Sequence, residues 1–186
     1  MAEQLSARDW LNQGLKALVE DGFTALKAEP LAKAMGVSRG SFYWHFADVE
    51  AFHTGILEYW REIAAERIID DVEAAAAGQG DALQALLHRV FGERRALENA
   101  VRRWALVDPA AKAAVRAIDK RRLAYVEGLL RNTGISPEVA RARARILYWA
   151  YLGFALSDQT LPAAQQRAVV AEMLRLASPA TAAGDG

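Results

Sequence analysis

The chain has 186 residues, with 23 acidic and 23 basic side chains and no cysteine. This length can bury one sizeable core, or a small domain joined to a larger one. The lack of cysteine excludes disulfides and thiolate chemistry and fits a reducing cytoplasm. The longest apolar run, Ile146 to Leu156, is too short to cross a membrane, and the first fifteen residues do not resemble a secretory signal. We therefore expect a cytoplasmic protein with no membrane partner.

The segment from Lys27 to Phe46, KAEPLAKAMGVSRGSFYWHF, predicts a helix-turn-helix. Leu31 and Met35 lie four residues apart, which is the spacing of apolar positions on one helix face. Gly36 can end this first helix in a left-handed conformation. Ser38 can cap the second helix by accepting a hydrogen bond from an unpaired backbone N–H. A motif of this form places its second helix in the major groove of DNA.

Helical spacing divides the aromatic residues of the second helix into two groups. Phe42 and Phe46 share one face and are assigned to the core. Tyr43, Trp44 and His45 lie on or beside the opposite face, where their polar groups and rings can meet phosphates, sugars or a thymine methyl. The residues of this helix that we expect to contact DNA are Ser38, Arg39, Gly40, Ser41, Tyr43, Trp44 and His45.

Residues Leu11 to Phe52 resemble the N-terminal domain of the TetR family of transcriptional regulators. The matching elements are VEDGF at 19–23, LAKAMGVSRGSFYWHF at 31–46 and a helix that starts near Asp48. The resemblance implies a homodimeric DNA-binding regulator, usually a repressor. Its C-terminal domain would form the dimer and bind a small-molecule effector.

Two positions depart from the pattern of that family. Lys27 stands where a Ser or Thr usually opens the first helix of the motif, and its side chain can still reach a phosphate. We therefore include Lys27 among the predicted DNA contacts. Val49 stands where a Lys usually contacts the DNA backbone, so one phosphate contact is expected to be missing.

Charge supports DNA binding only locally. Residues 1–50 carry more acidic than basic side chains, but within the motif Lys27, Lys33 and Arg39 face only Glu29. Positive charge is therefore concentrated near the predicted recognition surface. We expect binding that depends on dimer geometry and base contacts more than on bulk electrostatics.

The chain as a whole is predicted to be all-α. It is divided into an N-terminal three-helix helix-turn-helix domain at 1–50, a larger helical effector-binding and dimerisation domain at 51–177, and a disordered tail at 178–186. The stretch GQGD at 78–81 is the clearest linker, and Asp81 can cap the helix that follows. Outside the motif, the predicted helices are Ala7–Glu20 with Ser6 as its cap, Asp48–Ala77, Asp81–Arg95, Leu97–Val107, Pro109–Asn132, Pro137–Ser157 and Pro162–Ala177.

The last two helices are the predicted dimer interface. The helix at 137–157 is apolar on two faces, which indicates burial on two sides. Two such helices from each subunit would make a four-helix bundle across a two-fold axis. Alternatively, the same residues fill the core of one monomer. The residues concerned are Ile146, Ala150, Gly153, Phe154, Val170, Met173 and Leu174.

A small-molecule pocket is predicted from aromatic residues with polar groups and from nearby arginines. The segment Arg94 to Arg122 is rich in basic residues, which is usually a sign of a solvated helix face, with an anionic effector as the alternative. Individual aromatics can also be ordinary core residues. The predicted lining residues are Tyr59, Trp60, Phe91, Arg102, Trp104, Tyr125, Tyr148 and Trp149.

Enzyme chemistry is not indicated by the sequence. His45, His53 and His88 stand at no spacing typical of a catalytic pair or a metal site, and there is no Gly-rich phosphate loop. We expect no catalytic residues, no metal and no cofactor. The expected function is a DNA-binding regulator controlled by a small molecule. The alternative is a helical ligand-binding or interaction protein that has lost DNA binding, which Val49 and the acidic N-terminal balance would fit.

Overall fold

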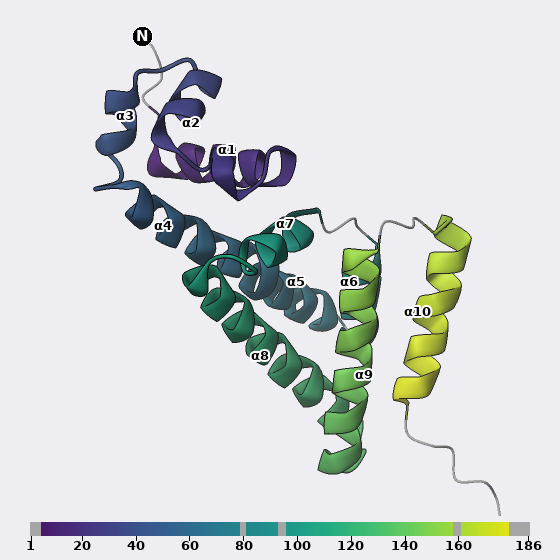
Figure 1. The fold of residues 1–186 in the computed structure, drawn as a ribbon. Helices are drawn as coiled ribbons and strands as arrows, with labels where there is room; N and C mark the ends of the chain where they lie inside the picture. The colour runs from purple at the N-terminus through teal and green to yellow at the C-terminus, as the bar shows by residue number, and fades with distance from the viewer. Residues whose placement is uncertain (1–4, 79–80, 93–95, 158–160, 179–186) are drawn as a thin grey trace, which may run out of the picture. The chain divides into compact units, whose positions relative to one another are not determined.

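The computed structural model describes residues 5–78, 81–92, 96–157 and 161–178 (Figure 1). Within these residues the fold consists of helices and turns, which confirms the all-α prediction. No helix in the described ranges is both long and apolar enough to span a membrane. The helices are α1 (Ala7–Glu20), η1 (Phe23–Ala25), α2 (Ala28–Ala34), α3 (Arg39–Tyr43), α4 (Val49–Arg61), η2 (Glu62–Glu66), α5 (Arg67–Ala76), α6 (Ala82–Phe91), α7 (Ala96–Trp104), α8 (Pro109–Arg131), α9 (Pro137–Leu156) and α10 (Ala163–Ala177).

Packing groups the helices into two compact units. Unit 1 comprises Met1–Glu66 and Arg95–Ile118, and unit 2 comprises Arg67–Arg94 and Asp119–Gly186. The packing therefore places α7 and the start of α8 with the N-terminal helices. The division predicted from the sequence, at residues 50 and 51, concerns function and remains a prediction.

The local signals in the sequence account for most helix boundaries. Ser6 caps α1, and the Asp9 carboxylate accepts a hydrogen bond from the Ser6 backbone N–H at 2.7 Å. The Asp81 carboxylate caps α6 by accepting from the N–H of Leu83 at 2.8 Å. Each cap satisfies a backbone donor that has no partner within its own helix. The predicted range of the first helix and the Ser6 and Asp81 caps are confirmed.

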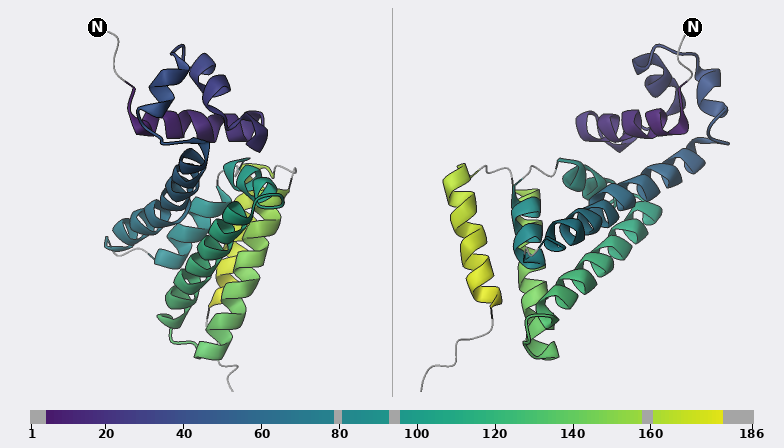
Figure 2. Two further views of the ribbon diagram at one scale, coloured as in Figure 1. Left: turned by 60° about the vertical axis from the view of Figure 1, so that its left-hand side comes forward. Right: turned by 180° about the vertical axis from the view of Figure 1, so that it is seen from behind.

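The helix predicted over Asp48–Ala77 is continuous but not uniform. It begins at α4, where the Asp48 carboxylate accepts from the Ala51 N–H at 2.7 Å. It then passes through η2, a π-helical turn, before continuing as α5. Figure 2 shows the helices from two further sides, with the N-terminal ones in purple to dark blue. Two later helices end earlier than predicted, α6 at Phe91 and α7 at Trp104. Within the GQGD linker, residues 79–80 lie outside the described residues, as do residues 179–186 of the predicted tail.

Unit 1 is built around large aromatic side chains. The helices α1 and α4 pack together, and α1 also packs against α2 and α7. Gly14 allows a close approach of α1 to α4, because a Cβ at this position would lie 2.5 Å from the Ile56 Cδ1 atom and 2.7 Å from the Phe52 Cζ atom. The fully buried aromatic side chains of this core are Trp10, Phe42, Phe52, Trp60 and Trp104.

Unit 2 has a separate core formed by α5, α6, the second part of α8, α9 and α10. Helix α6 packs against α5, α9 and α10. Side chains of α9 form hydrogen bonds to α8 and to the end of α10. The Tyr148 hydroxyl on α9 donates to Asp119 Oδ1 on α8 at 2.5 Å, and Arg143 Nη1 on α9 donates to the Ala177 carbonyl at the end of α10 at 3.0 Å.

Candidate DNA interface

The recognition helix α3 is short and is anchored to the core by one aromatic residue. Phe42 is fully buried, and its ring packs against those of Trp10 and Phe52 with centroid distances of 5.3 and 5.2 Å. Phe46 packs on the same cluster and is partly buried. The placement of Phe42 and Phe46 on the core side is therefore confirmed.

The turn between α2 and α3 has the predicted geometry. Gly36 adopts a φ of 69°, a left-handed conformation that glycine tolerates without a steric penalty. Ser38 occupies the N-cap position of α3, but its hydroxyl accepts no capping hydrogen bond within the described residues. The expected side-chain cap is thus not observed.

The opposite face of α3 is exposed. Trp44 is 87% exposed and Tyr43 is 45% exposed, which are unusual values for large aromatic side chains. The Arg39 guanidinium lies over the Tyr43 ring, 5.7 Å from its centroid, which is the geometry of a cation–π contact. Of the other predicted contacts on this face, Ser38 and Gly40 are exposed, and Ser41 and His45 are half-buried.

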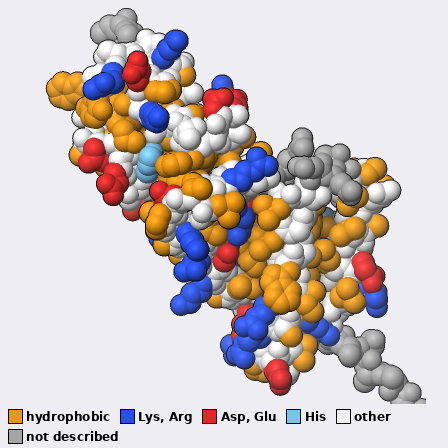
Figure 3. Space-filling view, in the orientation of Figure 1, with side chains coloured by type: hydrophobic (Ala, Val, Ile, Leu, Met, Phe, Trp, Pro, Cys, Tyr) orange, Lys and Arg blue, Asp and Glu red, His pale blue; other side chains and the backbone are white. Residues whose placement is uncertain are grey.

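A basic hollow of about 600 Å³ lies beside α3, between residues of α2, α3 and the start of α4. Three of its lining side chains are cationic and one, Glu29, is acidic. We call this surface the basic hollow. Its lining residues are Lys27, Ala28, Glu29, Pro30, Lys33, Arg39, Tyr43 and Val49. Figure 3 shows Lys and Arg side chains on the surface formed by the N-terminal helices.

The basic hollow brings together residues that are distant in sequence. Lys27, Arg39 and Tyr43 were predicted as DNA contacts, and they line it. Lys33 also lines it; the sequence placed Lys33 among the positive charges of the motif but not among the predicted DNA contacts. Val49 lines the hollow as well, so an apolar side chain stands at the edge of a cationic surface.

The predicted ligand residues are distributed over both units. Tyr59, Trp60, Arg102 and Trp104 belong to unit 1, and the other four belong to unit 2. In unit 1, Trp60 and Trp104 are fully buried in the core. The Nε atom of Arg102 donates to the buried Glu98 carboxylate at 2.7 Å, so its charge already has an internal partner.

In unit 2, the four predicted ligand residues have different environments. Phe91 is buried, whereas Trp149 is 65% exposed. Burial raises the pKa of the Tyr148 hydroxyl well above its ordinary value, because the charged form would lose hydration. The Tyr125 hydroxyl is buried and has no hydrogen-bond partner among the described residues.

The predicted dimer residues also divide by burial. Ile146 and Gly153 on α9 are exposed, while Val170 on α10 is buried in the core of unit 2. The remaining four, Ala150, Phe154, Met173 and Leu174, are half-buried. In the described ranges there is no cluster of three or more His, Cys, Asp or Glu residues that could hold a metal ion.

An exposed recognition helix beside a cationic hollow, held by a buried aromatic cluster, defines a DNA-binding protein of the helix-turn-helix class. Residues 11–52 match the family model described as "Bacterial regulatory proteins, tetR family". The match covers the helix-turn-helix segment, and the resemblance of this segment to the TetR family, predicted from the sequence, is confirmed.

Solved structures extend the comparison over the whole chain. The crystal structure of Mycobacterium smegmatis AmtR shares 15% sequence identity and a TM-score of 0.56, covering 96% of this chain and 89% of AmtR. It shows that the overall fold is shared. The crystal structure of BioQ with its natural double-stranded DNA operator shares 18% identity and a TM-score of 0.47, covering 94% of this chain and 99% of that one. No curated protein sequence matches the chain.

Proposed function

We propose that this protein is a transcriptional regulator that binds double-stranded operator DNA through α3 and the basic hollow. It acts as a repressor whose operator affinity changes when a small-molecule effector binds, and it lacks enzyme activity. The observation that carries the proposal is the exposed face of α3, with Trp44 almost fully accessible beside Arg39 and Tyr43. Such a regulator works in the cytoplasm, where bacterial DNA is accessible.

The two surfaces of the motif support different parts of recognition. The basic hollow presents Lys27, Lys33 and Arg39 to the DNA backbone, where cations neutralise phosphates and set the register of the protein. The α3 face presents Tyr43 and Trp44 to the groove, where rings and hydroxyls meet base edges and thymine methyl groups. Within each half-site, the phosphate contacts would set the register of the protein and the α3 face would set its sequence preference.

A second copy of the chain is needed for a two-fold operator. Helix-turn-helix dimers bind half-sites one helical turn apart, about 34–36 Å. Exposed apolar side chains gather on α9, where Ile146 is 59% exposed, Trp149 65% and Leu156 44%. Apolar surface is visible over α9 in Figure 3. We propose that this α9 face pairs with its counterpart in a second subunit.

Fluorescence anisotropy with duplexes from the DNA flanking the gene tests the proposal. We expect a specific complex that a scrambled duplex does not form. Lys33→Ala should weaken binding and reduce the slope of log affinity against log salt by about 1, because one phosphate contact is lost. Lys112→Ala is the matched control, since Lys112 is an exposed lysine on α8 that does not line the basic hollow.

The result that would overturn the proposal is equally specific. If no duplex is bound in preference to the scrambled sequence at low salt, and Tyr43→Ala behaves like the wild type, the helix-turn-helix does not bind DNA. The protein would then be a helical ligand-binding or interaction protein.

A further inference from the structure

A second hollow, distinct from the DNA surface, lies within unit 2 between α6, α9 and α10. Its volume is about 240 Å³. We call it the aromatic hollow. Its lining residues are Phe91, Ala150, Gly153, Phe154, Ser157, Leu161, Gln166, Val169 and Met173. Figure 1 shows α9 and α10 as neighbouring helices, and α6 packs against both.

The lining of the aromatic hollow is uncharged and suited to flat rings. None of its lining residues is acidic or basic, so a charged ligand would lose hydration without gaining an ionic partner. The Phe91 and Phe154 rings lie 5.2 Å apart at an interplanar angle of 44°, and Phe91 meets Tyr151 edge to face. Met173 adds a thioether, which makes favourable contacts with aromatic rings.

Small residues on α9 create the space. Ala150 and Gly153 lie where longer side chains would fill the hollow, and a Cβ on Gly153 would meet no atom within 4 Å. An apolar cavity of about 150 Å³ accommodates benzene, so a volume of 240 Å³ suits one or two fused rings. This volume is below the range of about 300–1,000 Å³ of pockets for larger ligands.

Polar groups lie at the rim of the hollow. Gln166 Nε2 donates to the Leu161 carbonyl at 3.0 Å, which holds this side chain in place. Ser157, the residue that follows α9, also lines the hollow. A ligand with one hydroxyl or ring N–H could therefore place that group at the rim and its rings inside.

We propose that the aromatic hollow binds an uncharged, planar aromatic molecule of one or two rings that carries at most one hydroxyl or ring N–H. The molecule is the effector of the regulator, and in that respect the inference rests on the proposed function. This molecule, rather than a second subunit, is assigned to the side of the hollow formed by Phe154, because two exposed side chains of the α9 face are directed away from Phe154. Trp149 and Leu156 lie roughly 140–160° around the α9 axis from Phe154.

Methionine-methyl NMR of the full chain tests this site with 2-naphthol as the probe. The chain has three methionines, and Met173 lines the hollow whereas Met35 packs against the core of unit 1. We expect 2-naphthol to shift the Met173 methyl signal saturably and to leave the Met35 signal unchanged. The anion 2-naphthoate, of nearly the same shape, should bind at least about tenfold more weakly.

Filling variants locate the site. Ala150→Leu should weaken 2-naphthol binding at least about tenfold, because the added methyl groups occupy the hollow. Ala142→Leu is the matched control, since it places the same change on an exposed position of α9 outside the lining. Val169→Trp fills the hollow from the exposed rim on α10, so the test remains available if Ala150→Leu does not fold.

Three results would overturn the inference. The first is a Met173 methyl signal that does not shift at about 1 mM 2-naphthol. The second is equal binding of 2-naphthol by the wild type and by both filling variants. The third is a Met173 signal that changes when the protein is diluted without any probe. The last would mean that a second copy occupies the hollow. Operator binding, measured separately by anisotropy, keeps the two proposals apart. Loss of 2-naphthol binding with operator binding intact refutes only the ligand site, and the reverse refutes only DNA binding.

Discussion

Neighbouring aromatic residues on one short helix have opposite environments. Phe42 is fully buried, whereas Trp44, two residues later, is 87% exposed. Phe42→Ala should lower the free energy of unfolding by about 3–5 kcal/mol, because it empties a packed aromatic site. Trp44→Ala should change stability by no more than about 0.5 kcal/mol but weaken operator binding about tenfold or more, through lost base contact.

Urea unfolding and fluorescence anisotropy on the same two variants measure this contrast. A Trp44→Ala variant that loses stability as Phe42→Ala does, with unchanged DNA affinity, would show that Trp44 has a packing role.

Val49 allows a gain-of-contact experiment. It lines the basic hollow. In the TetR family, which this segment resembles, a lysine usually stands at this position. Val49→Lys should strengthen DNA binding and steepen the salt dependence by about one phosphate contact. Val19→Lys, at an exposed position of α1 that does not line the hollow, controls for the added charge. Equal effects of the two variants would mean that only net charge matters.

At the scale of helices, the first cap of the chain predicts a pH dependence. The Ser6 side-chain and backbone hydrogen bonds hold the pKa of Asp9 below its ordinary value of 3.8. A depressed folded-state pKa means that the cap stabilises the protein above pH 3.8 and that this contribution is lost as pH falls through the folded pKa. Asp9→Asn should therefore be less stable than the wild type at pH 7.

The difference between Asp9→Asn and the wild type should shrink as the solution is acidified below the folded pKa of Asp9, which urea unfolding at several pH values measures. A difference that is constant across that range would show that the carboxylate charge does not contribute.

Two tyrosines in unit 2 allow a hydrogen-bonded hydroxyl to be compared with a buried hydroxyl that has no partner among the described residues. The Tyr148 hydroxyl donates to Asp119, whereas the Tyr125 hydroxyl is buried without a partner in the described part of the chain. Tyr148→Phe should cost about 1.5–3 kcal/mol, because it removes a bond to a charged group. Tyr125→Phe should be neutral or stabilising, since a buried unpaired hydroxyl is lost. Thermal unfolding compares them, and equal destabilisation would contradict the assignment.

Local sequence signals predicted the helices well, and tertiary packing explains what they missed. The range Ala7–Glu20 and the turn at Gly36 follow from caps, periodicity and backbone freedom, which are local properties. The π-helical turn η2 has no such local signal. The sequence placed Lys27, Lys33 and Arg39 in one motif, but the hollow that they line depends on how α2 and α3 pack around the turn. The hollow that Ala150 and Gly153 open on α9 also depends on α6 and α10, so helical spacing alone could not predict it. The assignment of these two residues to a dimer interface remains a prediction.

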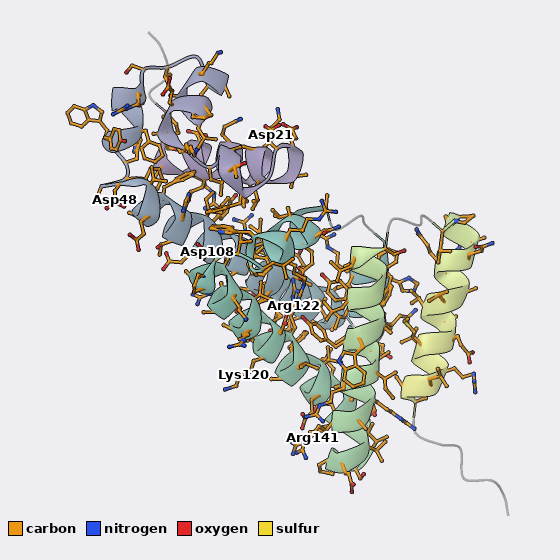
Figure 4. All side chains as sticks on the ribbon, in the orientation of Figure 1. Asp21, Asp48, Asp108, Lys120, Arg122 and Arg141 are labelled. Atoms are coloured by element: carbon orange, nitrogen blue, oxygen red, sulfur yellow. The ribbon has the colours of Figure 1, made fainter. Side chains whose placement is uncertain are left out.

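At the scale of the whole molecule, the charged surface is proposed to bind DNA and the apolar surface of α9 is proposed to form the dimer. The chain is formally neutral, so long-range attraction to DNA is weak, and the cations of the basic hollow act locally. Other cations, such as Lys120 and Arg122 on α8, belong to unit 2 and do not line the basic hollow (Figure 4). A neutral regulator gains operator affinity chiefly by joining two half-site contacts in one dimer.

The α9 face provides the test of that dimer. Trp149→Asp should convert the protein to a monomer of 20.4 kDa in sedimentation, because a charge replaces a central aromatic contact. Leu106→Asp is the control, since Leu106 is 84% exposed in unit 1 and lies outside the proposed interface. The monomeric variant should keep its helical content and bind single half-sites with unchanged affinity, but lose the tighter binding to a full operator. A wild-type protein that sediments as a monomer at micromolar concentration, or a Trp149→Asp variant that remains dimeric, would show that operator binding does not depend on this face.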